Sequence, residues 1–512
     1  MKIKDFFEHH GIVGNPFAEE DAQTDLVFKS HCIKTTYHPA WDKLFGSPAE
    51  PSTSIVFGEK GSGKTALRLQ MVRALGEYNA DHPDARPLVI EYDDFNPFLD
   101  AFRSRFSQRR SPERVLDQFR LWDHLDALLS LGTTQLVDRI LYPTEVSYPA
   151  AVDSRAIPVE KLSHHQKRDL LGLLVCYDHS RSEEPHVRLG RLMGKMQFRD
   201  WKGWFSVYNL LIFGIIGALI LLPLFCCGLY WNWFSWAFKA GMFRGVLAVG
   251  LLGAGSVVLP LLPYLVFRGR RLFDAIRLKR SVYVINRRSK SIQKLLMEFP
   301  KGDYGSLQLP FIRESNNRYE LLARFQKILE TLGFPGIIVL VDRVDEPYLI
   351  NGQTQLMKRL LWPILDNKLL QHPGVGLKML LLDSLLRLID RESKEFHERC
   401  RLDKQNLIRS LDWTGQSLYD LVNARLAACR AGEAMPSIDR FFDERISRQR
   451  LLDAFERLKV PRHLFKFLYR LLVVHGSAHT EGDPVWTISS ETFEATLAVY
   501  LKERDVAEAQ FA

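Results

Sequence analysis

The sequence predicts an α/β protein whose parallel sheet is split by a long insertion and is followed by a helical C-terminal domain. Two short apolar runs, at 54–57 and 337–342, have the continuous hydrophobicity of buried parallel strands. Between them lie two long stretches without charged residues, at 203–238 and 245–267. After residue 411, apolar residues recur at helical spacing. A chain of 512 residues has room for this arrangement, since one domain usually takes about 100–200 residues.

Composition excludes several classes of protein. Hydrophobic residues make up 46% of the chain and charged residues 25%. These are values of ordinary globular proteins and not of disordered or collagen-like chains. The six cysteines form no CxxC pair, and there is no HExxH motif, so no zinc or redox framework is expected.

The net charge of +9 is concentrated in two short stretches. Residues 268–290 carry nine Lys or Arg against one acid, and residues 191–202 carry four against one, so the rest of the chain is close to neutral. A basic nucleic-acid-binding face would spread over a domain. These two stretches flank the uncharged region instead, and no nucleic-acid partner is expected.

The uncharged region predicts a membrane hairpin across residues 203–268. A bilayer-spanning helix needs about 20 apolar residues, so two spans fit, near 205–228 and 243–267. Aromatic residues gather at the ends of the spans, where rings meet lipid headgroups: Trp201, Trp204, Tyr208, Trp231, Trp233, Phe234, Trp236 and Tyr264. The basic flanks place both ends of the hairpin in the cytoplasm by the positive-inside bias. Because MKIKDFFEHHG has no apolar segment, no cleaved signal peptide is expected.

The first strand-like run leads into a phosphate-binding loop. Residues 58–65 read GEKGSGKT, which matches G-x-x-x-x-G-K-[ST] and is followed by a helical pattern. Backbone N–H groups of such a loop surround phosphate oxygens, and the following helix directs its positive end at them. Lys64 is expected to reach the β- and γ-phosphates, and the Thr65 hydroxyl to coordinate Mg²⁺. The predicted nucleotide-binding residues of the loop are Gly58, Gly61, Ser62, Gly63, Lys64 and Thr65.

The second run ends in an acidic cluster that suits the same site. Asp342 follows residues 337–341 and is expected to hold the metal, through water. Asp345 and Glu346 come next, and either could polarise the attacking water. Arg343 occupies the position where related sites often have a second acid, so the choice of base stays open. Thr65 and Asp342 are 277 positions apart, which predicts one nucleotide-binding domain divided by the hairpin.

Further strands and helices complete the predicted organisation. Residues 86–93 and 377–383 predict two more strands, while 112–142 and 160–178 predict helices that lead as a stalk into the membrane. Asp383 could sense a γ-phosphate or could simply end a strand. Arg462 lies in the first turn of a predicted helix and could contact a bound nucleotide from a lid or could be a solvated surface residue.

Six segments follow from these patterns. They are a first part of the nucleotide-binding domain (1–100), a helical stalk (101–202), the hairpin (203–268), a basic return (269–316), the second part of the domain (317–400) and a helical lid (401–512).

The motifs resemble those of a known family. GEKGSGKT, VLVDRVDEP, LDWTGQSLYDLVNARL and VPRHLFKFL are similar to motifs of P-loop ATPases in the STAND/AAA+-related branch. A hairpin between the two Walker motifs resembles the KAP group of that branch. The resemblance implies ATP and Mg²⁺ as ligands, a nucleotide-contacting role for Arg462, a homo-oligomer and frequent use in bacterial defence. It also implies that Asn15–Phe17 lies against adenine. The family usually has a second acid where this chain has Arg343.

Two functions are therefore expected. The first is a Mg²⁺-dependent ATPase anchored in the inner membrane, with both terminal parts cytoplasmic, that acts as a nucleotide-driven switch with a protein partner that the sequence does not identify. Its predicted catalytic residues are Lys64, Asp345 and Glu346, and its metal-binding residues are Thr65 and Asp342. The alternative is a membrane effector for which ATP is mainly a ligand and the hairpin perturbs the bilayer. Substrate transport is less favoured because the two spans carry no charge from which to build a pathway.

Overall fold

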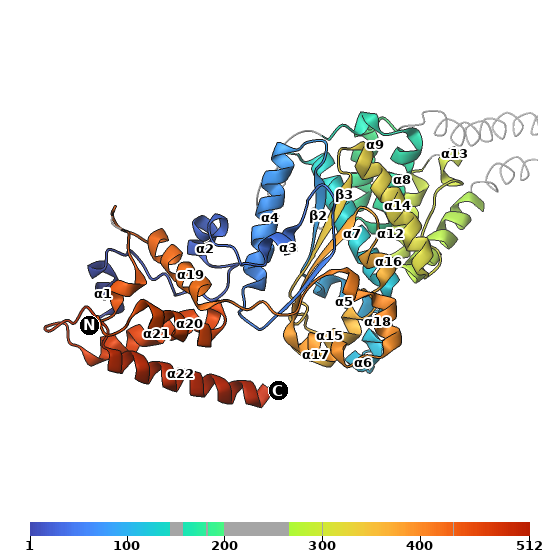
Figure 1. Ribbon diagram of the computed structural model, residues 1–512. Helices are drawn as coiled ribbons and strands as arrows, with labels where there is room; N and C mark the ends of the chain where they lie inside the picture. Colours follow the sequence, from blue (N-terminus) through green and yellow to red (C-terminus); the bar gives the residue numbers. More distant parts are fainter. Residues whose placement is uncertain (144–156, 181–182, 199–265, 300, 434, 512) are drawn as a thin grey trace, which may run out of the picture.

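A computed structural model describes residues 1–511 except 144–156, 181–182, 199–265, 300 and 434. Its centre is a parallel sheet in the order β2-β3-β4-β1-β5, which confirms the predicted α/β fold (Figure 1). The strands are β1 (Ser54–Gly58), β2 (Pro87–Tyr92), β3 (Gly336–Val341), β4 (Val375–Leu382) and β5 (Asn406–Ile408). The sequence predicts the first four, whereas β5 was not predicted and lies in the range assigned to the lid.

Strands from the two sides of the insertion are interleaved in the sheet. β1 lies between β4 and β5, so that Val56 is in register with Leu380 on one side and Ile408 on the other. β2 pairs with β3, from Pro87 opposite Gly336 to Tyr92 opposite Val341. β1 and β2 are therefore not neighbours, and each completes its hydrogen bonds with strands that follow the insertion.

The two faces of the sheet are covered by different helices because side chains alternate along each strand. Val56, Leu340 and Leu380 belong to an apolar cluster with Leu67 and Met71 of α4. The opposite side chains of the same strands join a larger cluster with α7 and α14: Ile55, Phe57, Ile337, Val339, Leu377 and Met379. The helices that contact the sheet directly are α3 (Trp41–Phe45), α4 (Lys64–Asp81), α7 (Leu121–Leu141), α14 (Ser315–Thr331), α16 (Asn367–Leu370) and α17 (Asp383–Asp390).

Of the predicted stalk helices, α7 packs on the sheet, and α8 (His164–Tyr177) packs on α7 and α14. The helix expected over 112–142 is two helices, α6 (Pro112–Leu116) and α7, because the Asp123 carboxylate accepts the Arg120 N–H at 2.9 Å and so begins a new helix. Leu125 and Leu129 are buried in the cluster shared with the strands. Other helices around this core are α5 (Asn96–Arg103), α9 (Pro185–Lys195), α12 (Ser289–Met297), α13 (Lys301–Tyr304), α15 (Thr354–Leu361), α18 (Lys394–Cys400) and a helical stretch at 266–281.

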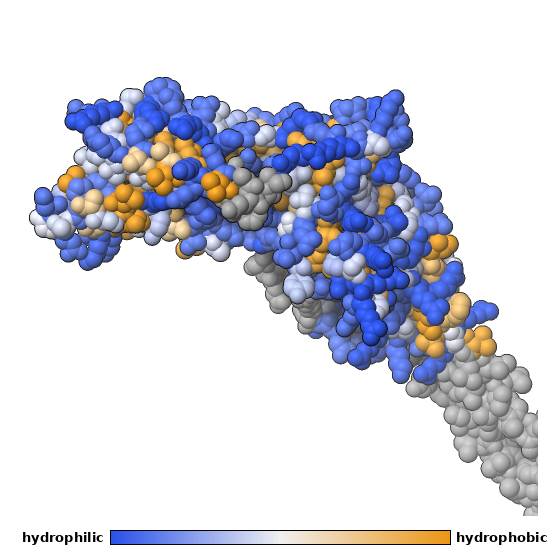
Figure 2. All heavy atoms as spheres, turned by 90° about the horizontal axis from the view of Figure 1, so that it is seen from below, coloured by the Kyte–Doolittle hydropathy of each residue, from blue (hydrophilic) through white to orange (hydrophobic). Residues whose placement is uncertain are grey.

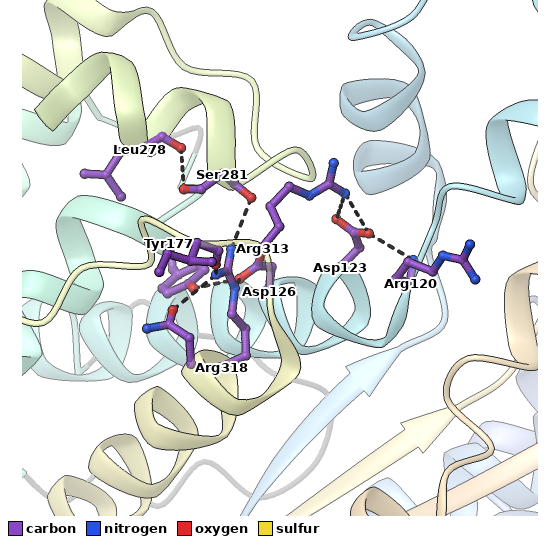
Figure 3. A network of polar contacts seen from close by, with 10 residues as sticks. Arg120, Asp123, Asp126, Tyr177, Leu278, Ser281, Arg313 and Arg318 are labelled. Carbon is purple, nitrogen blue, oxygen red and sulfur yellow. Dashed lines mark hydrogen bonds and ion pairs between the residues drawn. The ribbon is translucent and has the colours of Figure 1, made fainter. Parts of the chain in front are cut away.

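Buried ion pairs connect these helices to one another (Figure 3). The Arg318 guanidinium of α14 donates to both carboxylate oxygens of Asp126 on α7, at 3.0 and 3.1 Å, and to the Ser281 carbonyl at 3.1 Å. Tyr177 of α8 donates to Asp126 at 2.7 Å. Arg318 and Asp126 are both fully buried, so this network joins α7, α8, α14 and the 266–281 helix in a medium where an unpaired charge is costly.

The C-terminal helices form a separate apolar cluster at the other end of the molecule (Figure 1). They are α19 (Gly415–Ala428), α20 (Arg448–Leu458), α21 (Pro461–Ala478) and α22 (Ser490–Phe511). Phe6 and Phe7 of α1 (Ile3–His9) pack in this cluster, although the sequence places residues 1–100 in the nucleotide-binding domain. The remaining helix is α2 (Leu26–Ser30), and short 3₁₀ helices cover Cys32–Lys34, Val159–Lys161, Leu402–Lys404 and Ile438–Phe441.

The predicted hairpin lies outside the described residues, apart from its last residues at 266–268. No helix in the part of the chain that the structure describes is both long and apolar enough to cross a bilayer. Beside the grey trace, apolar side chains reach the surface (Figure 2). In the adjoining helical stretch at 266–281, the exposed large apolar side chains are Val266, Leu272 and Phe273.

The Asp126–Arg318 pair yields a stability prediction. Asp126→Ala leaves the buried guanidinium of Arg318 without its carboxylate, and we expect a loss of about 3–5 kcal/mol in the free energy of unfolding. The exposed pair of Asp117 and Arg359 offers a matched control, since Asp117→Ala should cost less than about 1 kcal/mol. Denaturant unfolding of the full chain measures both, and equal losses would contradict the assignment.

Candidate functional site

The loop between β1 and α4 has glycine where its backbone requires it. Gly61 and Gly63 have φ of 89° and 94°, in the left-handed region that side chains with a Cβ rarely adopt. A Cβ at Gly58 would lie 2.5 Å from Ser62 Oγ, so this position is closed to larger residues by contact within the loop. Gly63 directly precedes α4, so the loop delivers the chain to a helix N-terminus, where free N–H groups and the helix dipole attract anions.

Lys64 folds back over this loop. Its Nζ donates to the carbonyls of Gly58 at 2.8 Å and Glu59 at 2.7 Å. Burial lowers the pKa of Lys64 to about 8, although nearby Asp342, Asp345 and Asp383 act in the opposite direction. The amino group therefore lies at the loop with carboxylates around it, where a phosphate could replace the two carbonyls as its partner.

Thr65 and Asp342 meet although they lie on different sides of the insertion. Thr65 Oγ1 donates to Asp342 Oδ2 at 3.2 Å. Thr65 lies at the N-terminus of α4, and Asp342 directly follows β3. Burial raises the pKa of Asp342, while Arg68 opposes that change most strongly. A hydroxyl and a carboxylate are hard oxygen ligands that suit Mg²⁺. No group of three or more His, Cys, Asp or Glu side chains among the described residues is arranged to hold a metal alone, so further ligands must come from water or phosphate.

Arg68 is a buried member of the site that the motif did not indicate. Its guanidinium lies 3.4 Å from Asp342 and 2.9 Å from Asp93, and it also contacts Glu91. Glu91 is the second-last residue of β2 and Asp93 directly follows the strand, so Arg68 ties the carboxyl ends of β2 and β3 to α4. Its position one helical turn after Lys64 is the signal that could have found it, because residues four apart share a helix face.

The two candidate catalytic acids form ion pairs with nearby cations. Asp345 Oδ2 lies 3.4 Å from Nζ of Lys60 in the loop, and Glu346 pairs with Arg343. Arg343 has a φ of 57°, and this left-handed backbone turns the chain directly after Asp342. Both acids line the cavity described below. The charge of Asp345 also acts to raise the pKa of Lys64.

The C-terminal helices close over the loop through Arg462 and Trp413. The Arg462 N–H donates to the Gly61 carbonyl at 3.4 Å, and Arg462 Cβ lies 2.4 Å from where a Cβ of Gly61 would be. Trp413 Nε1 donates to the Ser62 carbonyl at 2.9 Å. Pro461 is the first residue of α21, as the sequence predicts, and this helix start fixes Arg462 beside the loop.

These elements enclose a cavity of about 290 Å³. One part is lined by the loop and the acidic residues. Another part is apolar, with Phe28, Leu421 and Phe465 among its lining residues, and includes Gln70, Thr36 and His38 as polar groups. A buried ion pair between Asp25 and Arg425, 2.6 Å long, joins the segment before α2 to α19 beside the cavity. Such a cavity can hold a flat apolar group together with a chain of phosphates.

Most of the predicted site residues line this cavity. They are Gly61, Gly63, Lys64, Thr65, Asp342, Asp345, Glu346 and Arg462. Gly58 and Ser62 shape the loop behind it and do not line it. Asn15, Pro16 and Phe17 do not line it: Phe17 packs with the C-terminal helices, and the expected contact of this element with adenine stays a prediction. Asp383 begins α17 near Lys64.

Comparison of the chain with family models, curated proteins and solved structures gave no match. The sheet and the loop geometry are consistent with a P-loop-like domain.

The lowered pKa of Lys64 predicts how stability depends on pH. The unfolded value is 10.5 and the folded value is about 8, so between these pH values the unfolded chain holds a proton that the folded protein has released. Unfolding then takes up a proton, and the free energy of unfolding rises with pH, by up to about 1.4 kcal/mol per pH unit. We expect Lys64→Met to lack this contribution.

Denaturant unfolding at several pH values above 8 measures this difference as a slope. The exposed Lys29 serves as a control, since Lys29→Met should keep the wild-type slope. Identical slopes in Lys64→Met and the wild type would contradict the assignment.

Proposed function

We propose that the protein is a Mg²⁺-dependent P-loop ATPase in which ATP binds between the sheet and the C-terminal helices. The observation that carries this proposal is the hydrogen bond of Thr65 to Asp342, 3.2 Å long, beside Lys64 at the N-terminus of α4. These residues come from either side of the insertion, yet they lie where a metal–triphosphate complex needs a hydroxyl, a carboxylate and a cation.

Each residue has a defined task in this proposal. The N–H groups of residues 61–65 bind phosphate oxygens, and Lys64 exchanges its two loop carbonyls for the β- and γ-phosphates. Thr65 and Asp342 would hold Mg²⁺, which neutralises charge that develops on the phosphates when it is bound. Trp413 and Arg462 close the C-terminal helices on the loop and exclude water from the phosphates.

Asp345 is the better placed of the two acids to orient the attacking water. It faces the loop through Lys60 and influences Lys64, whereas the Glu346 side chain is half exposed and paired with Arg343. A water held by Asp345 would attack the γ-phosphorus as the bond to the β-phosphate oxygen breaks. Release of Asp345 from Lys60 is required before it can accept a proton from water.

Membrane attachment is part of the proposal. Support comes from the uncharged stretches within residues 203–268, from the basic residues at 268–290, and from the exposed Val266, Leu272 and Phe273 beside them. The resemblance to the KAP group adds to this reading. It also motivates a homo-oligomer, a location in the inner membrane with both terminal parts cytoplasmic, and a role in bacterial defence with a protein partner.

A second candidate is a membrane effector for which ATP is a ligand and the hairpin is the output. The ion pairs of Lys60 with Asp345 and of Arg343 with Glu346 favour it, because both candidate acids are neutralised by cations of their own chain. Hydrolysis would then be slow, and binding alone would change the contacts between loop and C-terminal helices.

The ATPase proposal predicts that turnover depends on both halves of the site. Lys64→Ala and Asp342→Asn should each lower ATP turnover by about 100-fold or more, the loss typical of removing one group that stabilises transition-state charge. Asp345→Asn should lower turnover while nucleotide binding persists. Phosphate release by the detergent-purified protein measures turnover, with Asp390→Asn, a change in the exposed pair with Arg409, as the control.

Full turnover in Lys64→Ala would overturn the proposal. Tight binding of ATP without turnover in the wild type would instead favour the effector.

The effector candidate predicts leakage that follows binding and not hydrolysis. In proteoliposomes loaded with a self-quenching dye, ATP should cause release in the wild type and in the Asp345→Asn, Glu346→Gln double variant. Lys64→Ala should abolish release, because it removes the phosphate contact. Leakage that is lost in the double variant would count against this candidate.

A further inference from the structure

An acidic segment borders the phosphate part of the cavity. Residues 13–25, between α1 and α2, form no helix or strand. Three consecutive carboxylates of this segment, Glu19, Glu20 and Asp21, line the cavity. Carboxylates beside a polyphosphate repel it, so their presence needs a physical reason.

Glu20 is paired with cations of the C-terminal helices. Its Oε2 lies 3.2 Å from Nζ of Lys466 and 3.9 Å from Nε of Arg462, both on α21. Arg462 is the residue whose backbone contacts Gly61 of the loop, so its guanidinium lies close to the phosphate-binding backbone. Glu20 therefore attracts this cation through a long ion pair, while Nε of Arg462 makes no hydrogen bond and would be available to a phosphate at the loop.

The segment is fixed on both sides of Glu20. On one side, the Arg425 guanidinium donates to the Pro16 carbonyl at 2.7 Å, and on the other it forms the buried pair with Asp25. Gln23 Oε1 accepts from Arg343 at 3.1 Å, which links the segment to the turn after Asp342. Glu20 itself is exposed, so its side chain can move while the segment stays in place.

We propose that Glu20 is a positioning residue that competes with the terminal phosphate of a nucleoside triphosphate for Arg462. This inference rests on the proposed function, because it assumes that the cavity binds nucleotide. A triphosphate whose γ-phosphate bonds to Arg462 draws the guanidinium away from Glu20, whereas a diphosphate leaves the Glu20–Arg462 pair intact. Glu20 thus weakens triphosphate binding selectively and returns Arg462 to its resting partner when the terminal phosphate has left.

The test is the affinity of the full chain for a non-hydrolysable ATP analogue and for ADP, both with Mg²⁺. Glu20→Gln should tighten binding of the analogue by about two- to fivefold, in keeping with the strength of an exposed ion pair, and should leave ADP affinity unchanged. In an Arg462→Gln background, the same change should have no effect on the analogue, because the residue under competition is absent.

Glu19→Gln is the matched control. Glu19 lines the same cavity and its carboxylate accepts a hydrogen bond from Thr24 at 3.2 Å, so the change removes the same charge from the same segment. It should alter both affinities equally or not at all. The inference is overturned if Glu20→Gln behaves like Glu19→Gln, if it tightens ADP as much as the analogue, or if its effect persists in Arg462→Gln.

Failure of the inference can be told from failure of the proposed function. A wild-type protein that binds the analogue, with Glu20→Gln matching Glu19→Gln, refutes the role of Glu20 alone. A wild-type protein that binds neither nucleotide, while its folding is confirmed by circular dichroism, refutes the proposed function, and the role of Glu20 falls with it.

Discussion

The pairing of strands from opposite sides of the insertion is the constraint on which the structure depends. Among the strands that the structure describes, β1 hydrogen-bonds to β4 and β5 and β2 to β3, so β1 and β2 do not pair with each other. The chain must therefore close a very long loop before its sheet exists. Because the entropy of closing a loop grows only with the logarithm of its length, the insertion adds little to that cost. The site depends on the same pairing, since Thr65 after β1 and Asp342 after β3 meet only once β4 has paired with both strands.

The helices of the insertion connect the sheet rigidly to the chain segments that border residues 199–265. α7 packs on the sheet, and its Asp126 holds Arg318, which in turn binds the Ser281 carbonyl at the end of the 266–281 helix. On the other side of residues 199–265, the fully buried Arg188 of α9 pairs with Asp178 at 3.0 Å. The chain segments that border residues 199–265 are thus tied to the core by a buried ion pair on one side and by a hydrogen bond from the ion-paired Arg318 on the other. Breaking such a pair costs several kcal/mol. A displacement of the helices beside the sheet would therefore move these bordering segments with it and would not break the pairs.

The sequence predicted the features whose signal lies within a few consecutive residues. The loop of residues 58–65 and the strand before Asp342 are contiguous patterns, and both were correct in the fold. β5 was missed because three residues at a sheet edge are too few for any periodicity. The break before α7 depends on one capping contact of Asp123, which reads in the sequence as another polar residue on a helix.

The missed parts of the site share a different cause. Arg68, Glu20 and Asp25 matter through contacts with residues distant in the chain, and none belongs to a motif. A charged residue near the N-terminus or on a helix can be solvated in many ways, and only the tertiary structure determines which charged groups become its partners. The order of the sheet is likewise a global property that no single strand encodes.

Most cations of the site already have partners within the protein, and these partners contribute to the free energy of binding of any ligand. Lys64 donates to two loop carbonyls, and Lys60, Arg343 and Arg462 each contact a carboxylate. A polyphosphate therefore exchanges existing interactions for new ones, and only the difference appears as affinity. These exchanges free groups on three separate elements at once: the loop, the turn after β3 and α21. A ligand that changes the partners of all three biases the position of the C-terminal helices relative to the sheet, which is the differential interaction that a nucleotide-driven switch requires.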